Sequence, residues 1–189
     1  PLVKQLTKAV KNRDFEASKY IHLGATSQDI IDTATVLTIK EYVVWLEEKL
    51  IVLEGALVRL TKTHLKTLMM GRTLLQHAKP LTFGLKTAGW LESISRSKDR
   101  ISDLKQRLLC IQLGGAVGGG NDNITTDVQL KFAKNLDLHL SFPWQSQRDS
   151  LVEFASFLGI LSGSLGKIAK DISLLMQTEI GEVFEGAAE

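Results

Sequence analysis

The chain has 189 residues, of which 44% are hydrophobic and 23% are charged, as in a soluble globular protein with one substantial core. Its formal net charge is only +2, with acids and bases interleaved, so we expect no nucleic-acid surface and no polybasic membrane anchor. The single cysteine, Cys110, excludes an internal disulfide and a cysteine-rich zinc site. No run of about eighteen apolar residues and no signal peptide is visible, so we expect a cytoplasmic protein without a membrane span.

Neither end of the sequence reads as a natural terminus. Pro1 is not a translation start, and residues 185–189 do not close an element. We therefore expect an internal piece of a longer protein.

Hydrophobic periodicity predicts helices along most of the chain. The expected helices span residues 1–12, 26–67, 80–113, 125–138 and 151–175, with a turn over 12–17. Thr26 or Ser27 can cap the second helix, and Pro80 is expected to begin the third, since proline is favoured in a first helical turn. Apolar residues recur at spacings of three and four in two of these helices: Val36, Ile39, Val43, Leu46, Leu50, Leu53, Leu57 and Leu60, then Leu151, Phe154, Leu158, Leu161, Leu165, Ile168, Ile172 and Leu175.

The predicted fold class is all-α, because no strand-like alternation is found. Long helices with narrow apolar seams should pack as an elongated up-and-down bundle, and they should oligomerise through it because a monomer would expose the seams. Glycines and serines within 159–166 lower helix propensity, which favours the close approach of another helix backbone.

Three polar connections punctuate this bundle, over residues 20–29, 71–80 and 143–149. In the second, Arg72, Thr73, Gln76 and His77 supply a cation, a hydroxyl, an amide and an imidazole, which suit a carboxylate ligand. The alternative is an ordinary polar connection with a structural histidine. The helix between the first two connections would be roughly 55 Å long, so one chain cannot bring them together. A common site would have to form between subunits.

Other polar features carry less specific signals. The glycine-rich run 114–122 lacks the preceding strand and the Gly-Lys-Ser/Thr of a phosphate loop, so a flexible connection is the better interpretation. The four histidines, His22, His64, His77 and His139, show no metal-ligand spacing. Trp144 either stacks on a substrate or fills the end of the bundle.

The polar connections also resemble signature regions of the fumarase/aspartase superfamily. The matching segments are His-Leu-Gly-Ala-Thr-Ser-Gln-Asp at 22–29, Gly-Arg-Thr-Leu-Leu-Gln-His-Ala at 71–78, Gln-Arg-Asp at 147–149 and Met-Gln-Thr-Glu-Ile-Gly-Glu-Val at 176–183. Within the superfamily, segments 82–90 and 143–149 are most similar to the bacterial carboxymuconate cycloisomerase family. Adenylosuccinate lyases share segments 69–73, 77–78 and 82–86 and are the nearest competitors.

Two positions separate these families. Leu74 stands where the lyases carry a catalytic histidine, and leucine cannot transfer a proton. Trp144 stands where adenylosuccinate lyases have a glutamine that contacts the substrate. Both differences disfavour a nucleotide substrate.

The resemblance implies closure of 3-carboxy-cis,cis-muconate, a small tricarboxylate, to a lactone, with neither metal nor organic cofactor. It implies catalytic roles for Arg72, Thr73 and His77. It implies substrate binding by His22, Thr26, Ser27, Gln76, Trp144, Gln147 and Arg148. The implied assembly is a homotetramer with shared sites. The alternatives are a fumarate-releasing lyase and a non-catalytic oligomerisation scaffold.

The resemblance also divides the chain. Residues 1–29 would end an N-terminal helical domain and carry the first site loop, and residues 30–189 would form the central bundle. The base is expected in a serine loop beyond Glu189, so the sequence as given is expected to be inactive by itself.

Overall fold

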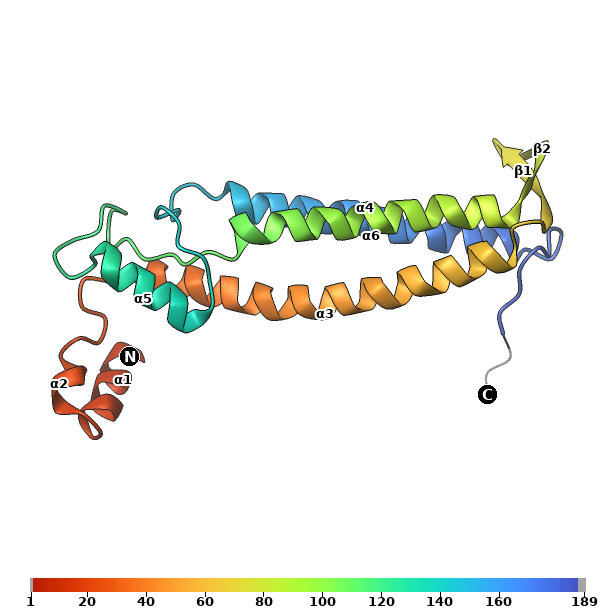
Figure 1. Cartoon of the computed structure of the whole chain (residues 1–189). Coiled ribbons are helices and arrows are strands. Elements are labelled where there is room, and N and C mark those ends of the chain that lie inside the picture. The colour runs from red at the N-terminus through yellow and green to blue at the C-terminus, as the bar shows by residue number, and fades with distance from the viewer. Residues whose placement is uncertain (1, 187–189) are drawn as a thin grey trace. The chain divides into compact units, whose positions relative to one another are not determined.

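A computed structural model describes residues 2–186, which form six helices and one two-stranded sheet (Figure 1). They divide into two compact units. The loop unit comprises Pro1–Tyr42 and Lys105–Leu151, and the hairpin unit comprises Val43–Leu104 and Val152–Glu189. The described residues are mostly helical, which confirms the predicted helical fold class.

The loop unit begins with two short helices, α1 (Leu2–Lys11) and α2 (Phe15–Ser18). The first is as predicted, but α2 occupies much of the expected turn because the Asp14 carboxylate accepts the Ala17 N–H at 2.9 Å and caps it. Helix α5 (Thr126–Leu136) begins after Thr125, whose hydroxyl accepts the Val128 N–H. The core of this unit consists of Val36, Ile111, Leu113, Ile124, Ala133 and Leu138.

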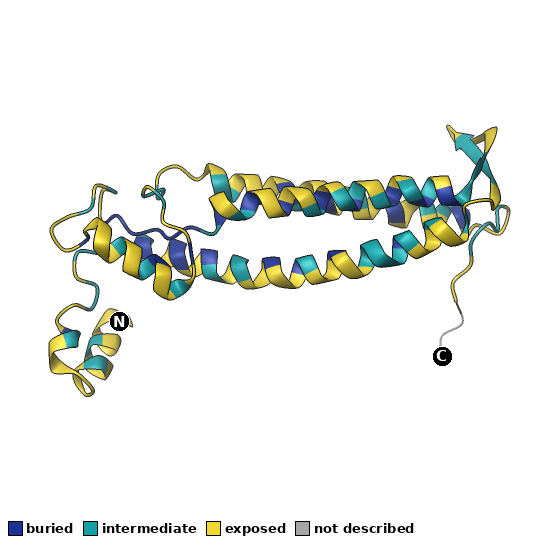
Figure 2. Ribbon diagram, in the orientation of Figure 1, coloured by how far each residue is buried: buried dark blue, intermediate teal, exposed yellow. Residues whose placement is uncertain are grey.

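Three long helices supply the hairpin unit: α3 (Ser27–Thr63), α4 (Phe83–Leu108) and α6 (Asp149–Leu175), each beginning or ending in the loop unit. Their periodic apolar residues are largely buried, as the spacing predicts (Figure 2). Within this unit α4 is tied to α3 by the Thr61–Thr87 hydroxyl pair at 3.0 Å and to α6 by the Trp90 indole N–H, which donates to Asp171 at 2.8 Å. The seam is imperfect at Leu60, Leu165 and Ile172, which are exposed.

A β-hairpin stands where the sequence predicted no strand. β1 (Leu68–Thr73) pairs antiparallel with β2 (Gln76–Thr82) through a two-residue turn. The prediction that Pro80 begins a helix was therefore wrong, as was the extension of α3 to 66 or 67. Pro80 lies in an exposed strand, where a missing N–H is tolerated. Helix α4 begins instead at Phe83, after Thr82, whose hydroxyl accepts the Leu85 N–H at 3.1 Å.

The hairpin escaped prediction for a physical reason. Its strands contain few β-branched or aromatic residues, and its turn is Leu74-Leu75 rather than the Asn-Gly pair that favours positive φ. Both leucines nevertheless adopt positive φ, 50° and 62°. The pairing also shifts between Met70 and Arg72, a bulge that masks the strand alternation.

Helix α6 has the length and composition of a membrane-crossing helix, alone among the described helices. The sequence predicted no such span. One helix of this kind is weak evidence, because core helices of soluble proteins meet the same criteria.

Candidate active site

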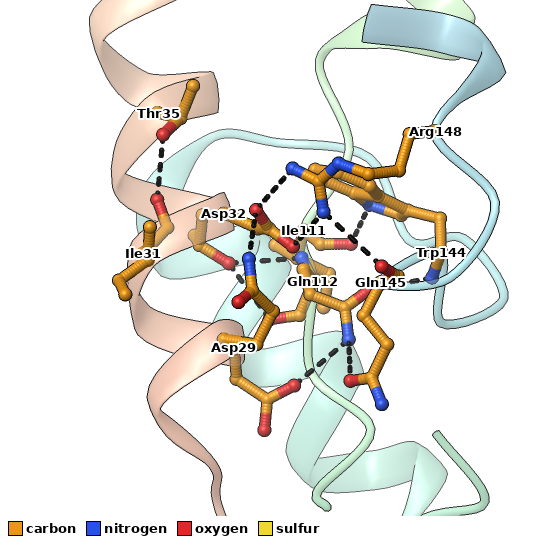
Figure 3. Close-up of polar contacts among 11 residues, drawn as sticks. Asp29, Ile31, Asp32, Thr35, Ile111, Gln112, Trp144, Gln145 and Arg148 are labelled. Carbon is orange, nitrogen blue, oxygen red and sulfur yellow. Dashed lines mark hydrogen bonds and ion pairs between the residues drawn. The ribbon is translucent and has the colours of Figure 1, made fainter. Parts of the chain in front are cut away.

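In the loop unit, Arg148 is held against the start of α3. Its guanidinium donates to both carboxylate oxygens of Asp32, at 3.0 and 2.7 Å (Figure 3). Asp32 is only 1% exposed and also accepts the Gln28 amide at 2.8 Å. The hydrogen bonds to Asp32 raise the pKa of Arg148, so its charge is fixed in a bidentate geometry.

Trp144 also contacts this arginine. The Arg148 guanidinium lies 5.5 Å from the centre of the Trp144 ring, a cation–π contact. The indole N–H donates to the Ile111 carbonyl at 3.0 Å, which fixes the plane of the ring. Of the two interpretations of Trp144, the structure thus shows a packed, anchored residue, and substrate stacking stays a prediction.

Gln112 connects this pair to the helix start. Its side chain is fully buried, and its amide oxygen accepts the Trp144 backbone N–H at 2.6 Å. Its amide nitrogen donates to Asp29 at 2.9 Å (Figure 3). The sequence did not identify Gln112, Asp29 or Asp32 as parts of a site, because their partners lie far along the chain.

The other predicted residues of the loop unit lie around this network. Thr26 is half-buried and donates its N–H to the Asp29 carboxylate at 2.9 Å, while Ser27 is exposed at the first position of α3. His22 is half-buried, with a φ of 61°. The Gln147 side chain is exposed, and its backbone N–H donates to the Trp144 carbonyl at 3.0 Å.

In the hairpin unit, Arg72 is held by Glu182. The guanidinium donates to both carboxylate oxygens, at 2.7 and 3.2 Å, and Glu182 also accepts the Met70 N–H at 3.3 Å. The hydrogen bonds from Arg72 outweigh burial and hold the pKa of Glu182 below its ordinary value. The bulge at Gly71 turns this part of β1, and a Cβ there would lie 2.5 Å from the Lys79 carbonyl oxygen.

Thr73, Gln76 and His77 lie at the exposed end of the hairpin. Thr73 pairs with Gln76 across the turn, and Arg72 pairs with His77. The turn itself presents two apolar side chains to solvent, with Leu74 95% and Leu75 73% exposed. The sequence-predicted residues of this connection therefore share one end of one hairpin.

A pocket of about 800 Å³ lies between the hairpin and the end of α6, within the hairpin unit. Its lining includes Arg72, Thr73, Lys79, Lys86 and Asp171. This volume falls in the range of small-molecule sites. Lys79 and Lys86 were not predicted as site residues, because lone lysines on helices and strands carry no specific signal.

Asp171 balances part of the positive charge beside this pocket. It pairs with Lys86 at 3.4 Å and with Lys167, besides accepting the Trp90 indole. Burial raises its pKa, but the hydrogen bonds from Lys167 and Trp90 and the nearby lysine charges outweigh burial, so the net shift is downward. The carboxylate thus stays ionised.

Within the described part of the chain, no group of three or more His, Cys, Asp or Glu side chains is placed to hold a metal ion. The predicted site residues fall into two sets. His22, Thr26, Ser27, Trp144, Gln147 and Arg148 belong to the loop unit, and Arg72, Thr73, Gln76 and His77 belong to the hairpin unit.

Comparison with known proteins supports the resemblance. A family model described as "Lyase" matches residues 2–189. A 3-carboxy-cis,cis-muconate cycloisomerase of Pseudomonas aeruginosa is 47% identical over 99% of this chain and 41% of its own length. The crystal structure of the 3-carboxy-cis,cis-muconate lactonizing enzyme from Pseudomonas putida superposes with a TM-score of 0.91 at 46% identity, covering 100% of this chain and 44% of that one.

A second solved structure, a fumarate lyase from Mesorhizobium sp. BNC1, superposes with a TM-score of 0.90 at 44% identity, over 98% of this chain and 44% of that one. The chain therefore spans less than half the length of these relatives. The sequence match covers both units and every predicted site residue. The chain belongs to the lyase family of the fumarase/aspartase superfamily.

Proposed function

We propose that the protein carrying this chain is a cycloisomerase that converts 3-carboxy-cis,cis-muconate to a carboxymuconolactone. The observation that carries the proposal is the similarity to cycloisomerases along essentially the whole chain. The hairpin supports it, since its exposed tip offers Leu74 where the superfamily's lyases place a proton-donating histidine.

The proposed reaction needs hydrogen-bond donors and neither a metal nor an organic cofactor. One substrate carboxylate adds across a conjugated double bond, and a proton is delivered to the carbon beside another carboxylate. The costly species is the doubly negative aci-carboxylate, which preorganised hydrogen-bond donors stabilise. We assign that role to Thr26, Ser27, Arg72, Thr73 and Gln76.

Arg72 and Arg148 would bind a substrate carboxylate differently from an unpaired cation. Arg72 and Arg148 each donate to a carboxylate of the chain, so each pair is nearly neutral as a unit. A guanidinium has five N–H groups, and bidentate pairing leaves some of them for a substrate carboxylate. We propose that Arg148, with Gln147 and Trp144, orients one substrate carboxylate, while His22 supports the first loop.

His77 is the proposed proton carrier or anion ligand of the hairpin. It is exposed, and it pairs in register with Arg72, so it lies at the same end as Thr73. An imidazole can both donate and accept a hydrogen bond, which suits both roles.

A complete site is proposed to combine units from different subunits of a homotetramer. Helix α3 has 37 residues, so it is about 55 Å long, and the two sets of site residues adjoin its opposite ends in the sequence. This length is why we propose that the two sets in one site come from different subunits. We further propose that residues 1–29 end an N-terminal domain and that residues 30–189 belong to the central bundle. We also propose that the enzyme is cytoplasmic.

The test is an assay of the complete protein that carries this sequence. With 3-carboxy-cis,cis-muconate we expect loss of the diene absorbance and formation of a lactone, while adenylosuccinate should release no fumarate. A lyase is the alternative favoured by the fumarate lyase structure. Fumarate release alone would overturn the proposal, and turnover of neither substrate would favour the scaffold.

A further inference from the structure

The glycine-rich segment at residues 114–122 is connected to the carboxylate of Asp29, and the proposed reaction assigns no role to either. Asp29 lies in the first turn of α3 and is only 1% exposed. One of its oxygens accepts the Gly114 N–H at 2.9 Å and the Gln112 amide at 2.9 Å. The other accepts the Gly115 N–H at 3.0 Å and the Thr26 N–H at 2.9 Å.

All four of these partners are neutral N–H groups. Hydrogen bonds to an ionised carboxylate are about twice as strong as neutral ones, and the helix N-terminus favours a negative charge in its first turn. Asp29 therefore joins three separate stretches of backbone: the loop before α3, the start of α3 itself and the glycine-rich segment.

The two glycines are required by this geometry. A Cβ on Gly114 would lie 2.6 Å from Cβ of Pro143, and a Cβ on Gly115 would lie 2.9 Å from the Gly24 carbonyl oxygen. Gly115 also has a φ of 71°, in the left-handed region that favours glycine. Only a chain without side chains at both positions can present two consecutive N–H groups to Asp29.

The first loop is fixed to the same segment from its other end. The Asn121 side chain donates to the Gly24 carbonyl at 2.9 Å, and its amide oxygen accepts the Asn123 N–H at 2.9 Å. The glycine-rich run was expected to be a flexible connection. Its described contacts instead fix it to the loop preceding α3 through hydrogen bonds to Asp29 and to the Gly24 carbonyl.

We propose that Asp29 is a positioning residue, whose carboxylate clamps the Gly114–Gly115 backbone to Thr26 and so fixes the conformation in which Thr26 and Ser27 meet the substrate. This inference rests on the proposed function only in assigning those two residues to substrate binding. An asparagine at position 29 would turn an NH₂ group toward N–H donors, so part of the clamp must open.

The experiment compares Asp29→Asn with Leu50→Ala in the complete protein. Leu50 is a buried seam residue of the hairpin unit, whereas Asp29 belongs to the loop unit, so the Leu50 variant serves as the control for lost stability. With carboxymuconate at a temperature where both variants are folded, Asp29→Asn should lower kcat/KM by about 10- to 100-fold, whereas Leu50→Ala should stay within about twofold. Equal kcat/KM values for the two variants would overturn the proposal.

A second readout separates this inference from the proposed function. Hydrogen exchange without substrate should be accelerated at Thr26, Gly114 and Gly115 in Asp29→Asn and unchanged there in Leu50→Ala. Unchanged exchange at these amides would overturn the clamp even if the enzyme is a cycloisomerase. Accelerated exchange in a protein that does not turn over carboxymuconate would leave the clamp standing and remove the proposed reaction.

Should Asp29→Asn fail to fold, Gly115→Ala serves as the second variant. An alanine there strains the positive φ and presses on the Gly24 carbonyl, so the Gly115 N–H must move away from Asp29. The same loss in kcat/KM and the same local exchange are expected. Wild-type values for both quantities would contradict the clamp.

Discussion

Each unit pairs one arginine with one carboxylate, but the two pairs differ in how far their side chains are exposed to solvent. Asp32 projects from a helix and is 1% exposed, and its partner Arg148 is 41% exposed. In the hairpin unit, Glu182 lies in an irregular segment beyond α6, and both members of the pair are about one-fifth exposed, at 19% and 23%. The loop unit thus buries its carboxylate completely, whereas the hairpin unit leaves both partners within reach of water.

This difference predicts which partner is costly to lose. In the loop unit the buried carboxylate depends on its arginine, because an unpaired charge cannot be hydrated there. In the hairpin unit either partner can recover some hydration.

The largest effect is expected for Arg148→Ala. It leaves the Asp32 carboxylate buried with only the Gln28 amide as a described partner, so unfolding should require about 3 kcal/mol less free energy. Urea unfolding followed by circular dichroism measures the loss. The double variant Asp32→Leu with Arg148→Ala should recover part of it, and a loss below about 0.5 kcal/mol in the single variant would show that Asp32 is not truly buried.

Arg72→Ala should cost only about 1 kcal/mol of stability, since Glu182 remains partly hydrated. Its effect on turnover of carboxymuconate should be much larger, at least about 100-fold in kcat, if Arg72 donates to the developing charge as we propose. Steady-state kinetics on the folded variant decides the matter. Full activity would remove Arg72 from the site.

Leu75→Gly tests the strained turn. Leu75 adopts a φ of 62° and is 73% exposed, so glycine relieves strain and removes little packing. We expect a gain of about 0.5 to 1 kcal/mol in the free energy of unfolding, reduced by the greater entropy of glycine in the unfolded chain. Thermal unfolding compared with Leu85→Gly, an exposed helical position that should be destabilised, reveals whether the turn is strained.

The smallest effect is a pH dependence from Glu182. Because Arg72 lowers the pKa of Glu182 below its ordinary value of 4.5, folding favours the ionised form. Its contribution should be complete above that ordinary value and be lost as the pH falls through the lower folded pKa. The stability difference between wild type and Glu182→Gln should therefore shrink from pH 6 to pH 3, and a constant difference would contradict the pairing.

Periodicity in the sequence was sufficient to predict the long helices, since buried residues such as Val43, Leu50 and Leu161 recur at helical spacing. The hairpin could not be found in this way, because its turn is made of two leucines at positive φ, where glycine or asparagine is the usual residue. Its strands also contain few residues with high strand propensity.

Of the candidate site, the sequence predicted only residues of the three polar connections. Arg72 stood out because a guanidinium beside a hydroxyl and an amide suits a carboxylate ligand, and Arg148 was implied by the resemblance to the superfamily. Their partners, Glu182 and Asp32, lie 110 and 116 residues away, so no local pattern joins them. The same holds for Asp29 and Gly114, whose contact decides how the first loop is held.

The most direct test of a site shared between the two units is complementation between two variants of the complete protein. Ser27→Ala is expected to impair the loop unit and Thr73→Val the hairpin unit, and each variant alone should have little cycloisomerase activity. If each site takes its loop unit and its hairpin unit from different subunits, co-assembled mixtures should regain about a quarter of wild-type activity. A mixture no more active than the two variants separately would contradict the shared site.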